Sequence, residues 1–195
     1  MNHIGRKIYH LTGGLALISL YVLPGRTLGL LALLAVFVLV TGADVARLNI
    51  PAFNEFMYRR FPRFIRDSER QKLTGTPWYV LGILCSAAFY GLPVAVYAVA
   101  YLACGDVAAT AVGERWGSVK VSGEKSLQGT AAFLVSSVIA GAVIDLWLYP
   151  VSPAVFLAGA AAAAVAEILP LPIDDNLLVP VISGGLMRLM LLAGA

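Results

Sequence analysis

The sequence alternates long runs of apolar residues with shorter polar segments. A transmembrane helix needs about 20 mostly apolar residues, and seven runs come near that length. They cover residues 8–23, 27–43, 77–92, 93–112, 127–149, 153–169 and 177–192. The pattern predicts an all-α fold, a polytopic integral membrane helical bundle of about seven transmembrane helices.

The composition strengthens this prediction. Hydrophobic residues make up 59% of the chain and charged residues only 13%, whereas soluble domains carry about 25% charged residues. The basic residues do not build a soluble face with interleaved aromatic side chains, which argues against nucleic acid as a partner. We expect one membrane-embedded catalytic domain over residues 1–195, located in the cell membrane among its lipids.

Lysine and arginine gather in alternate polar segments of the chain. With the N-terminus in the cytoplasm, all but Arg26 and Arg188 of the 14 basic residues fall in cytoplasmic segments, as the positive-inside rule requires. Most acidic residues also lie near cytoplasmic ends of the predicted helices. A transporter would concentrate them near the midplane, so the pattern favours an enzyme with its active site on the cytoplasmic face.

The longest polar segment, residues 45–76, is basic and amphipathic. It carries seven basic and three acidic residues, and phenylalanines recur near helical spacing after a predicted helix start at Asn49 and Pro51. Such a segment is typical of a helix lying on an anionic leaflet. It serves either as a surface anchor or as a rim that guides lipid or nucleotide to the site.

An acidic residue, Asp106, lies inside an apolar run, where insertion of a carboxylate costs about 2.5–3.5 kcal/mol. Small residues recur every four positions beside it, at Gly105, Ala109, Gly113 and Gly117, which predicts a helix-packing face. Asp106 should therefore point into the bundle, where it is either protonated or paired with a cation. Mg²⁺ fits this position if phosphate is present, because it binds one or two carboxylates together with phosphate oxygens.

Residues 113–130 form a polar loop that we interpret as a nucleotide loop. A helix is predicted to begin at Leu127, and the free N–H groups of a helix start bind anions. The spacing does not match the P-loop pattern, and the positive-inside rule is the alternative explanation for the two lysines. The candidate nucleotide contacts are Lys120, Lys125, Ser126, Gly129 and Thr130.

Two further polar groups lie at predicted helix ends. Asp174, Asp175 and Asn176 are consecutive, and a helix N-cap accounts for only one of them. Adjacent carboxylates repel each other unless a cation intervenes, which indicates a metal. Arg6 and His10 lie one helical turn apart, either as a polar helix end or as functional residues.

Six stretches together resemble the CTP-dependent lipid-alcohol kinases, a family that includes dolichol kinase, phytol and farnesol kinase and the yeast-type CTP-dependent diacylglycerol kinase. These kinases are grouped with the phosphatidate cytidylyltransferases. The D-x-x-A-x-x-x-G block is similar in both groups, while K-S-x-x-G-T and D-D-N look more like the kinases. The stretches are RKIYH (6–10), ADVARL (43–48), RDSERQKLTGTPWYVLG (66–82), GDVAATAVGERWG (105–117), EKSLQGT (124–130) and EILPLPIDDNLLVP (167–180).

The resemblance implies Mg²⁺-dependent transfer of the γ-phosphoryl group of CTP to the hydroxyl of a membrane lipid alcohol. That alcohol would be a polyprenol or dolichol, phytol or another isoprenoid alcohol, or diacylglycerol. Asp106, Lys125 and His10 are the expected catalytic residues, and Asp106, Asp174 and Asp175 the expected metal ligands. The remaining expected residues are Asn176 and Arg6 at the nucleotide, and Asp44, Arg47, Glu69 and Glu167 in support of the site or at the substrate.

Two other functions remain open at the level of sequence. The first is a phosphatidate cytidylyltransferase, which makes a CDP-lipid at the same kind of site. The second is a transporter or scaffold without enzymatic activity. The general base, either an aspartate or His10, and the oligomeric state are also left open.

Overall fold

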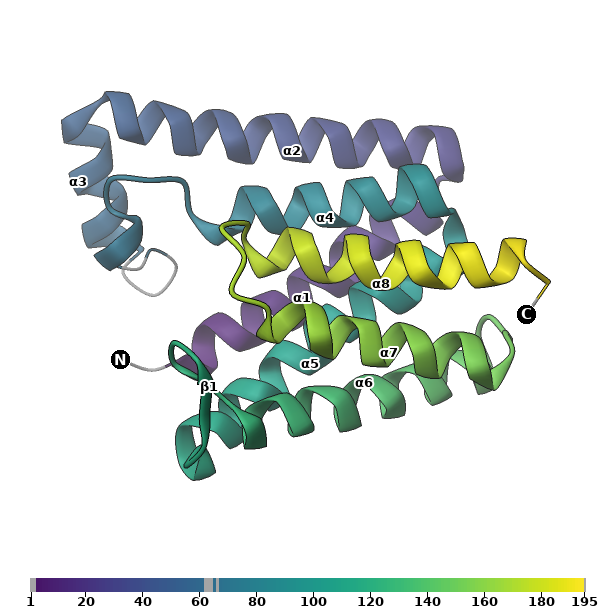
Figure 1. Ribbon diagram of the computed structural model, residues 1–195. Coiled ribbons are helices and arrows are strands. Elements are labelled where there is room, and N and C mark those ends of the chain that lie inside the picture. Colours follow the sequence, from purple (N-terminus) through teal and green to yellow (C-terminus); the bar gives the residue numbers. More distant parts are fainter. Residues whose placement is uncertain (1–2, 62–64, 66, 195) are drawn as a thin grey trace.

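The computed structural model describes residues 3–61, 65 and 67–194, and the side chains of residues 3–8 and 68 lie outside that description. Each of the seven apolar runs is a helix. These helices are α1 (His3–Val22), α2 (Arg26–Asn49), α4 (Gly75–Tyr90), α5 (Leu92–Trp116), α6 (Leu127–Trp147), α7 (Pro153–Ile168) and α8 (Asp175–Leu192). They lie side by side in one bundle (Figure 1).

The predicted all-α membrane bundle is confirmed, but the count of seven membrane crossings is not. Among the described residues, four helices are long and apolar enough to cross a membrane: α2, α5, α6 and α8. Two shorter apolar segments, Tyr9–Val22 and Pro153–Ile168, lie in α1 and α7. The chain is thus a membrane protein whose shorter helices pack among longer ones.

Helix α5 lies at the core and packs most extensively against α6. Glycines allow this close approach: a Cβ atom on Gly105 would lie 2.5 Å from the Phe133 ring, and one on Gly113 would lie 3.3 Å from Ser126 Oγ. The predicted small-residue packing face is therefore confirmed. Tyr101 is fully buried here, and its hydroxyl donates to the main-chain oxygen of Phe156 at 2.8 Å.

One end of the bundle carries additional elements. Helix α3 (Pro51–Arg60) turns across this end after α2 (Figure 1), and a 3₁₀ turn, η1 (Asp67–Glu69), leads toward α4. Pro51 is the first residue of α3, as expected, because a proline at this position loses no helical hydrogen bond. Arg63, Phe64 and Arg66 of the same basic segment lie outside the described residues.

The loop between α5 and α6 contains a structure that the sequence pattern did not predict. Strands β1 (Lys120–Ser122) and β2 (Lys125–Ser126) form a two-stranded antiparallel hairpin. Gly123 has a φ of 57° at its turn, a conformation that suits glycine. The hairpin lies at the same end of the bundle as α3, and this end is called the polar end below.

Candidate active site

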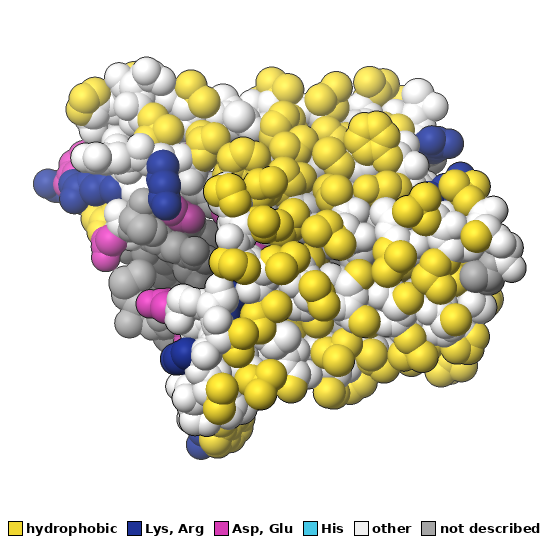
Figure 2. Space-filling model, viewed as in Figure 1, with side chains coloured by type: hydrophobic (Ala, Val, Ile, Leu, Met, Phe, Trp, Pro, Cys, Tyr) yellow, Lys and Arg dark blue, Asp and Glu magenta, His cyan; other side chains and the backbone are white. Residues whose placement is uncertain are grey.

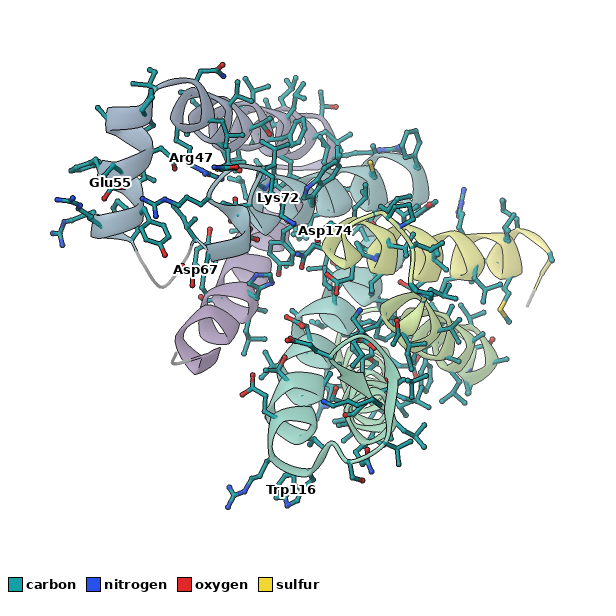
Figure 3. The ribbon with its side chains drawn as sticks, turned by 60° about the vertical axis from the view of Figure 1, so that its left-hand side comes forward. Arg47, Glu55, Asp67, Lys72, Trp116 and Asp174 are labelled. Atoms are coloured by element: carbon teal, nitrogen blue, oxygen red, sulfur yellow. The ribbon has the colours of Figure 1, made fainter. Side chains whose placement is uncertain are left out.

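The polar end brings together side chains from six segments of the chain. Figure 3 shows polar side chains of α2, of the segment before α4 and of the start of α8 on this end, where Arg47, Lys72 and Asp174 are labelled. The starts of α4, α6 and α8 all lie here, so their partly positive N-terminal ends face the same region. This arrangement favours binding of an anion.

Lys125 joins three segments at the centre of this end. Its Nζ donates to Asp175 Oδ2 at 3.1 Å and to the main-chain oxygen of Glu167, and it lies 3.4 Å from Glu167 Oε1. The Lys125 side chain is 32% exposed, so a ligand can still reach it. Burial alone would lower the pKa of Lys125, but the charges of Asp175 and Glu167 outweigh burial and raise it. Lys125 is therefore charged at neutral pH.

The start of α6 supports Lys125 from one side. Ser126 is buried, and its Oγ accepts the N–H of Gly129 at 3.2 Å, so it serves as the N-cap of α6. Thr130 Oγ1 donates to Glu167 Oε2 at 3.4 Å. Lys120, by contrast, is exposed and donates to the main-chain oxygen of Glu124 at 3.0 Å. The two lysines of the predicted nucleotide loop thus have different surroundings.

Lys125, Glu167 and Asp175 are called the lysine cluster below. A second group at this end is the pair His10 and Asp106. His10 Nδ1 is 3.9 Å from Asp106 Oδ2, and the Asp106 side chain is 25% exposed. Glu167 interacts electrostatically with Asp106 as well as with Lys125 and Asp175. The structure thus brings the pair and the lysine cluster to the same end of the bundle, and their function as one site stays a prediction.

Tyr79 of α4 orients His10 and was not singled out from the sequence. Its hydroxyl donates to the main-chain oxygen of His10 at 2.6 Å, and the two rings are 4.8 Å apart. Its neighbour across the bundle is Gly14, where a Cβ atom would lie 2.4 Å from the Tyr79 hydroxyl. Tyr79 lies within one of the stretches that carry the family resemblance, which is the signal that pointed to its surroundings.

The three consecutive polar residues at the start of α8 have distinct roles. Asp174 is the N-cap, and its Oδ1 accepts the backbone N–H of Asn176 at 3.0 Å and the Asn176 amide at 2.7 Å. Asp175 pairs with Lys125. Asn176 is buried and lies against the start of α4. A Cβ atom on Gly75 would lie only 3.0 Å from the Asn176 Nδ2. Asp174 and Asn176 thus have a structural role in addition to any ligand contact.

The described side chains include no group of three histidine, cysteine or acidic residues arranged to hold a metal ion by themselves. Asp106, Asp174 and Asp175 therefore do not form a complete metal-binding site by themselves. Mg²⁺ does not require one when phosphate oxygens complete its coordination, because one or two carboxylates are then sufficient. The residues at this end fit a metal that arrives with a nucleotide.

Asp44, Arg47 and Glu69 hold the start of α4 in place. The Arg47 side chain is 1% exposed; it bonds Asp44 Oδ1 at 2.5 Å and the main-chain oxygens of Glu69 and Lys72 at 3.1 and 2.7 Å. Asp44 Oδ2 accepts the N–H and the hydroxyl of Thr74 at 2.6 and 3.0 Å. This set, called the α4 clamp below, explains why α2 continues to Asn49, six residues beyond the predicted run.

Glu69 completes the clamp. Its Oε1 accepts the N–H of Gly75 at 3.1 Å, so the first N–H groups of α4 have acceptors. Because Gly75 lies against Asn176, the clamp also fixes where α4 meets the start of α8. Asp44, Arg47 and Glu69 therefore support the site through α4. The side chain of Arg6 lies outside the described residues.

A cavity of about 530 Å³ lies away from this site. It is lined almost entirely by apolar residues of α2 and α4, from Arg26 to Leu34 and from Leu84 to Phe89. The α4 clamp is at the other ends of these two helices. Arg26 is the only charged residue among the described residues that line it, and none of them is acidic. The polar end therefore remains the candidate site for phosphate chemistry.

Comparison with known proteins gives three similar relatives, each described as CTP-dependent diacylglycerol kinase 1. The relative from Eremothecium gossypii is 33% identical over 153 residues, which is 76% of this chain and 48% of the relative. The relative from Saccharomyces cerevisiae is 31% identical over 152 residues, 76% of this chain and 50% of the relative. The relative from Schizosaccharomyces pombe is 28% identical over 170 residues, 76% of this chain and 74% of the relative.

The chain spans about half the length of the first two relatives. No family model matches the sequence, and no solved structure matches it either.

Proposed function

We propose that this chain, which belongs by its sequence to the family of CTP-dependent lipid kinases, is itself an active kinase of that type. It transfers the γ-phosphoryl group of CTP to the hydroxyl of a membrane lipid alcohol. The reaction takes place at the polar end of the bundle, on the cytoplasmic side of the membrane.

The observation that carries this proposal is the meeting of two sets of side chains at one end of a membrane bundle. Lys125 with Glu167 and Asp175 forms one set, and His10 with Asp106 forms the other. Phosphoryl transfer depends mainly on positioning the reactants and on stabilising the charge of the transferred group. A charged, partly exposed lysine beside an acidic and imidazole pair supplies both requirements.

Each set has its own role in the proposed reaction. Lys125 binds the phosphate oxygens of the donor and stabilises the charge that develops on the γ-phosphoryl group. The His10–Asp106 pair orients the lipid hydroxyl and accepts its proton as the new bond to phosphorus forms and CDP leaves. Mg²⁺ bound with the triphosphate would offset part of its charge, and Asp106 and Asp175 are the carboxylates that would hold it.

Diacylglycerol is the acceptor that we place first. All three relatives carry that substrate in their names, and the site lies at the end of membrane helices, where the hydroxyl of an embedded lipid is found. Polyprenol, dolichol and phytol present a hydroxyl at the same level. They are the alternative acceptors within the same proposal.

The test is an assay of the purified protein in bilayers with CTP and Mg²⁺. Diacylglycerol, phytol, farnesol, a polyprenol and phosphatidate are offered one at a time, and CDP release is measured. We expect CDP release that depends on a lipid alcohol and stops when EDTA removes the metal. Absence of CDP release with every alcohol, in protein that is folded by thermal unfolding, would refute the proposal.

A further inference from the structure

The end of α5 and the hairpin that follows it, which carries Lys125, expose apolar side chains. Trp116 is 60% exposed, Val119 51% and Val121 53%. Exposing a cluster of this kind to water is unfavourable, and such a patch commonly marks a surface that contacts a membrane or another molecule. The three residues are called the hairpin patch below.

The geometry separates the patch from the bundle. Val119 lies directly before β1 and Val121 lies within it, and both residues are more than half exposed. Figure 3 shows Trp116 at the far end of α5, directed away from the other helices. Figure 2 shows hydrophobic and basic side chains together at the lower left corner of the molecule, where Figure 1 shows the hairpin and the end of α5.

Basic groups accompany the patch. The Arg115 guanidinium lies 5.1 Å from the centre of the Trp116 ring, a cation–π contact. Lys120 is exposed beside the two valines. Tryptophan and basic residues are enriched together at the level of lipid headgroups, where one side of the residue meets hydrocarbon and the other meets phosphate and water.

The position of the hairpin identifies its partner. It joins α5 and α6, both of which are long and apolar enough to cross a membrane, so the loop between them stays at the membrane surface. We propose that the hairpin patch inserts into the headgroup region of the leaflet at the polar end, with Arg115 and Lys120 on anionic lipid phosphates. The partner is a phospholipid surface that carries negative charge.

This contact reaches the proposed catalytic lysine through hydrogen bonds between the hairpin and the start of α6. β1 pairs with β2 so that Lys120 lies opposite Ser126. Leu127 N donates to the main-chain oxygen of Val119 at 2.9 Å, and Val119 N donates to Gln128 Oε1 at 3.3 Å. A leaflet that holds Val119 and Val121 thereby holds the segment from Lys125 to Gln128 beside Asp175. This consequence, unlike the insertion itself, depends on the proposed function.

The insertion is tested by measuring the depth of Trp116 in nanodiscs that contain phosphatidylglycerol. Trp78→Phe with Trp147→Phe leaves Trp116 as the fluorophore. Nitroxide-labelled lipids report contact with the membrane, and aqueous iodide reports contact with water. The quenching of Trp116 by each agent is divided by the quenching that the same agent causes in a free tryptophan amide. We expect this ratio to be about threefold higher for a headgroup nitroxide than for iodide, as for an interfacial aromatic residue. Full quenching by iodide without quenching by lipid would overturn the proposal.

The link to Lys125 is tested with Val119→Ser combined with Val121→Ser. In bilayers we expect the KM for CTP to rise about three- to tenfold at nearly unchanged thermal stability, because the leaflet no longer holds the hairpin. Leu148→Ser, at a site 60% exposed at the other end of α6, is the matched control and should leave KM unchanged. An unchanged KM in the double variant would refute the link.

The two proposals fail in different ways. A protein without CTP turnover whose Trp116 is quenched by lipid would refute the kinase function and keep the insertion. An active kinase whose Trp116 is fully open to iodide would refute the insertion alone.

Discussion

Asp106 is a carboxylate in a membrane helix with a histidine 3.9 Å away and about a quarter of its side chain exposed. Glu167 is close enough to interact with it electrostatically. An ionisable group at this depth in a membrane helix is energetically unfavourable. A residue that served only for packing would not need a carboxylate. At the scale of single residues, Asp106 is therefore the group whose removal should affect chemistry most and folding least.

We expect Asp106→Asn to abolish CTP turnover while the protein remains folded, because the amide keeps the size of the side chain and loses its charge. The measurement is CDP release, together with thermal unfolding in detergent. Asp145→Asn is the matched control, since Asp145 lies near the other end of α6 and accepts the N–H of Val151 at 2.7 Å. Near-normal turnover of folded Asp106→Asn protein would exclude a role for Asp106 in catalysis or metal binding.

The two lysines of the nucleotide loop should differ in effect. Lys125→Ala removes a charged group held between Asp175 and Glu167 and should lower kcat about 10²–10³-fold, the usual cost of losing one charge-stabilising donor. Lys120→Ala removes an exposed side chain whose Nζ donates to the main-chain oxygen of Glu124, and kcat should change little. Steady-state kinetics in detergent compares them. If both substitutions had equally small effects on kcat, the positive-inside rule would be sufficient to explain the presence of Lys125.

The sequence singled out Asp106 and Lys125 as candidates because each breaks a local pattern. Asp106 interrupts an apolar run, and Lys125 precedes a helix start in a short polar loop. It did not single out Thr74 or Tyr79, whose importance rests on contacts with Asp44 and His10 far away in the chain. A tyrosine or threonine near a helix end carries no local signal of such a partner.

At the scale of elements, the α4 clamp joins the end of α2 to the start of α4. Arg47 is almost fully buried, and besides Asp44 it donates to three main-chain oxygens in the segment before α4 and to Asn54 Oδ1 of α3. A buried guanidinium with this many partners fixes the position of the helix start. That start contacts Asn176 of α8, so the clamp determines the shape of the site at a distance.

Arg47→Ala should destabilise the protein by about 3–5 kcal/mol, because it leaves the buried Asp44 carboxylate without its partner. The measurement is unfolding in detergent. Arg59→Ala is the control, since the Arg59 side chain is 78% exposed and its pair with Glu55 is on the surface. If both substitutions changed stability equally, the clamp would not support α4.

The elements were predicted unequally. Seven apolar runs indicated seven helices, because hydrophobicity over a helix length is a strong signal. The extension of α2 to Asn49 was not predicted, since it depends on contacts of Arg47 with residues 69–72. The hairpin was not predicted either, because two strands of two or three residues have no hydrophobic period that a sequence pattern can reveal.

At the scale of the whole molecule, the polar end collects the acidic and basic residues that the sequence spreads over the chain. This end should face the cytoplasm. In a protein that carries Cys85→Ala and Cys104→Ala, we expect Glu124→Cys to react with an impermeant maleimide only in inverted vesicles. Leu148→Cys, at the opposite end of α6, should react only in intact cells. The reverse pattern would place the polar end outside.

The central claim is that the polar end moves the γ-phosphoryl group of CTP to a lipid hydroxyl. A cytidylyltransferase would use the same nucleotide at the same face, but lipid phosphate would attack the α-phosphorus and pyrophosphate would leave. CTP labelled separately at the α and γ positions, incubated with the protein in bilayers that contain both diacylglycerol and phosphatidate, separates the two reactions. The account predicts γ label in the lipid and α label in CDP. Lipid that carries α label, with release of pyrophosphate, would contradict it.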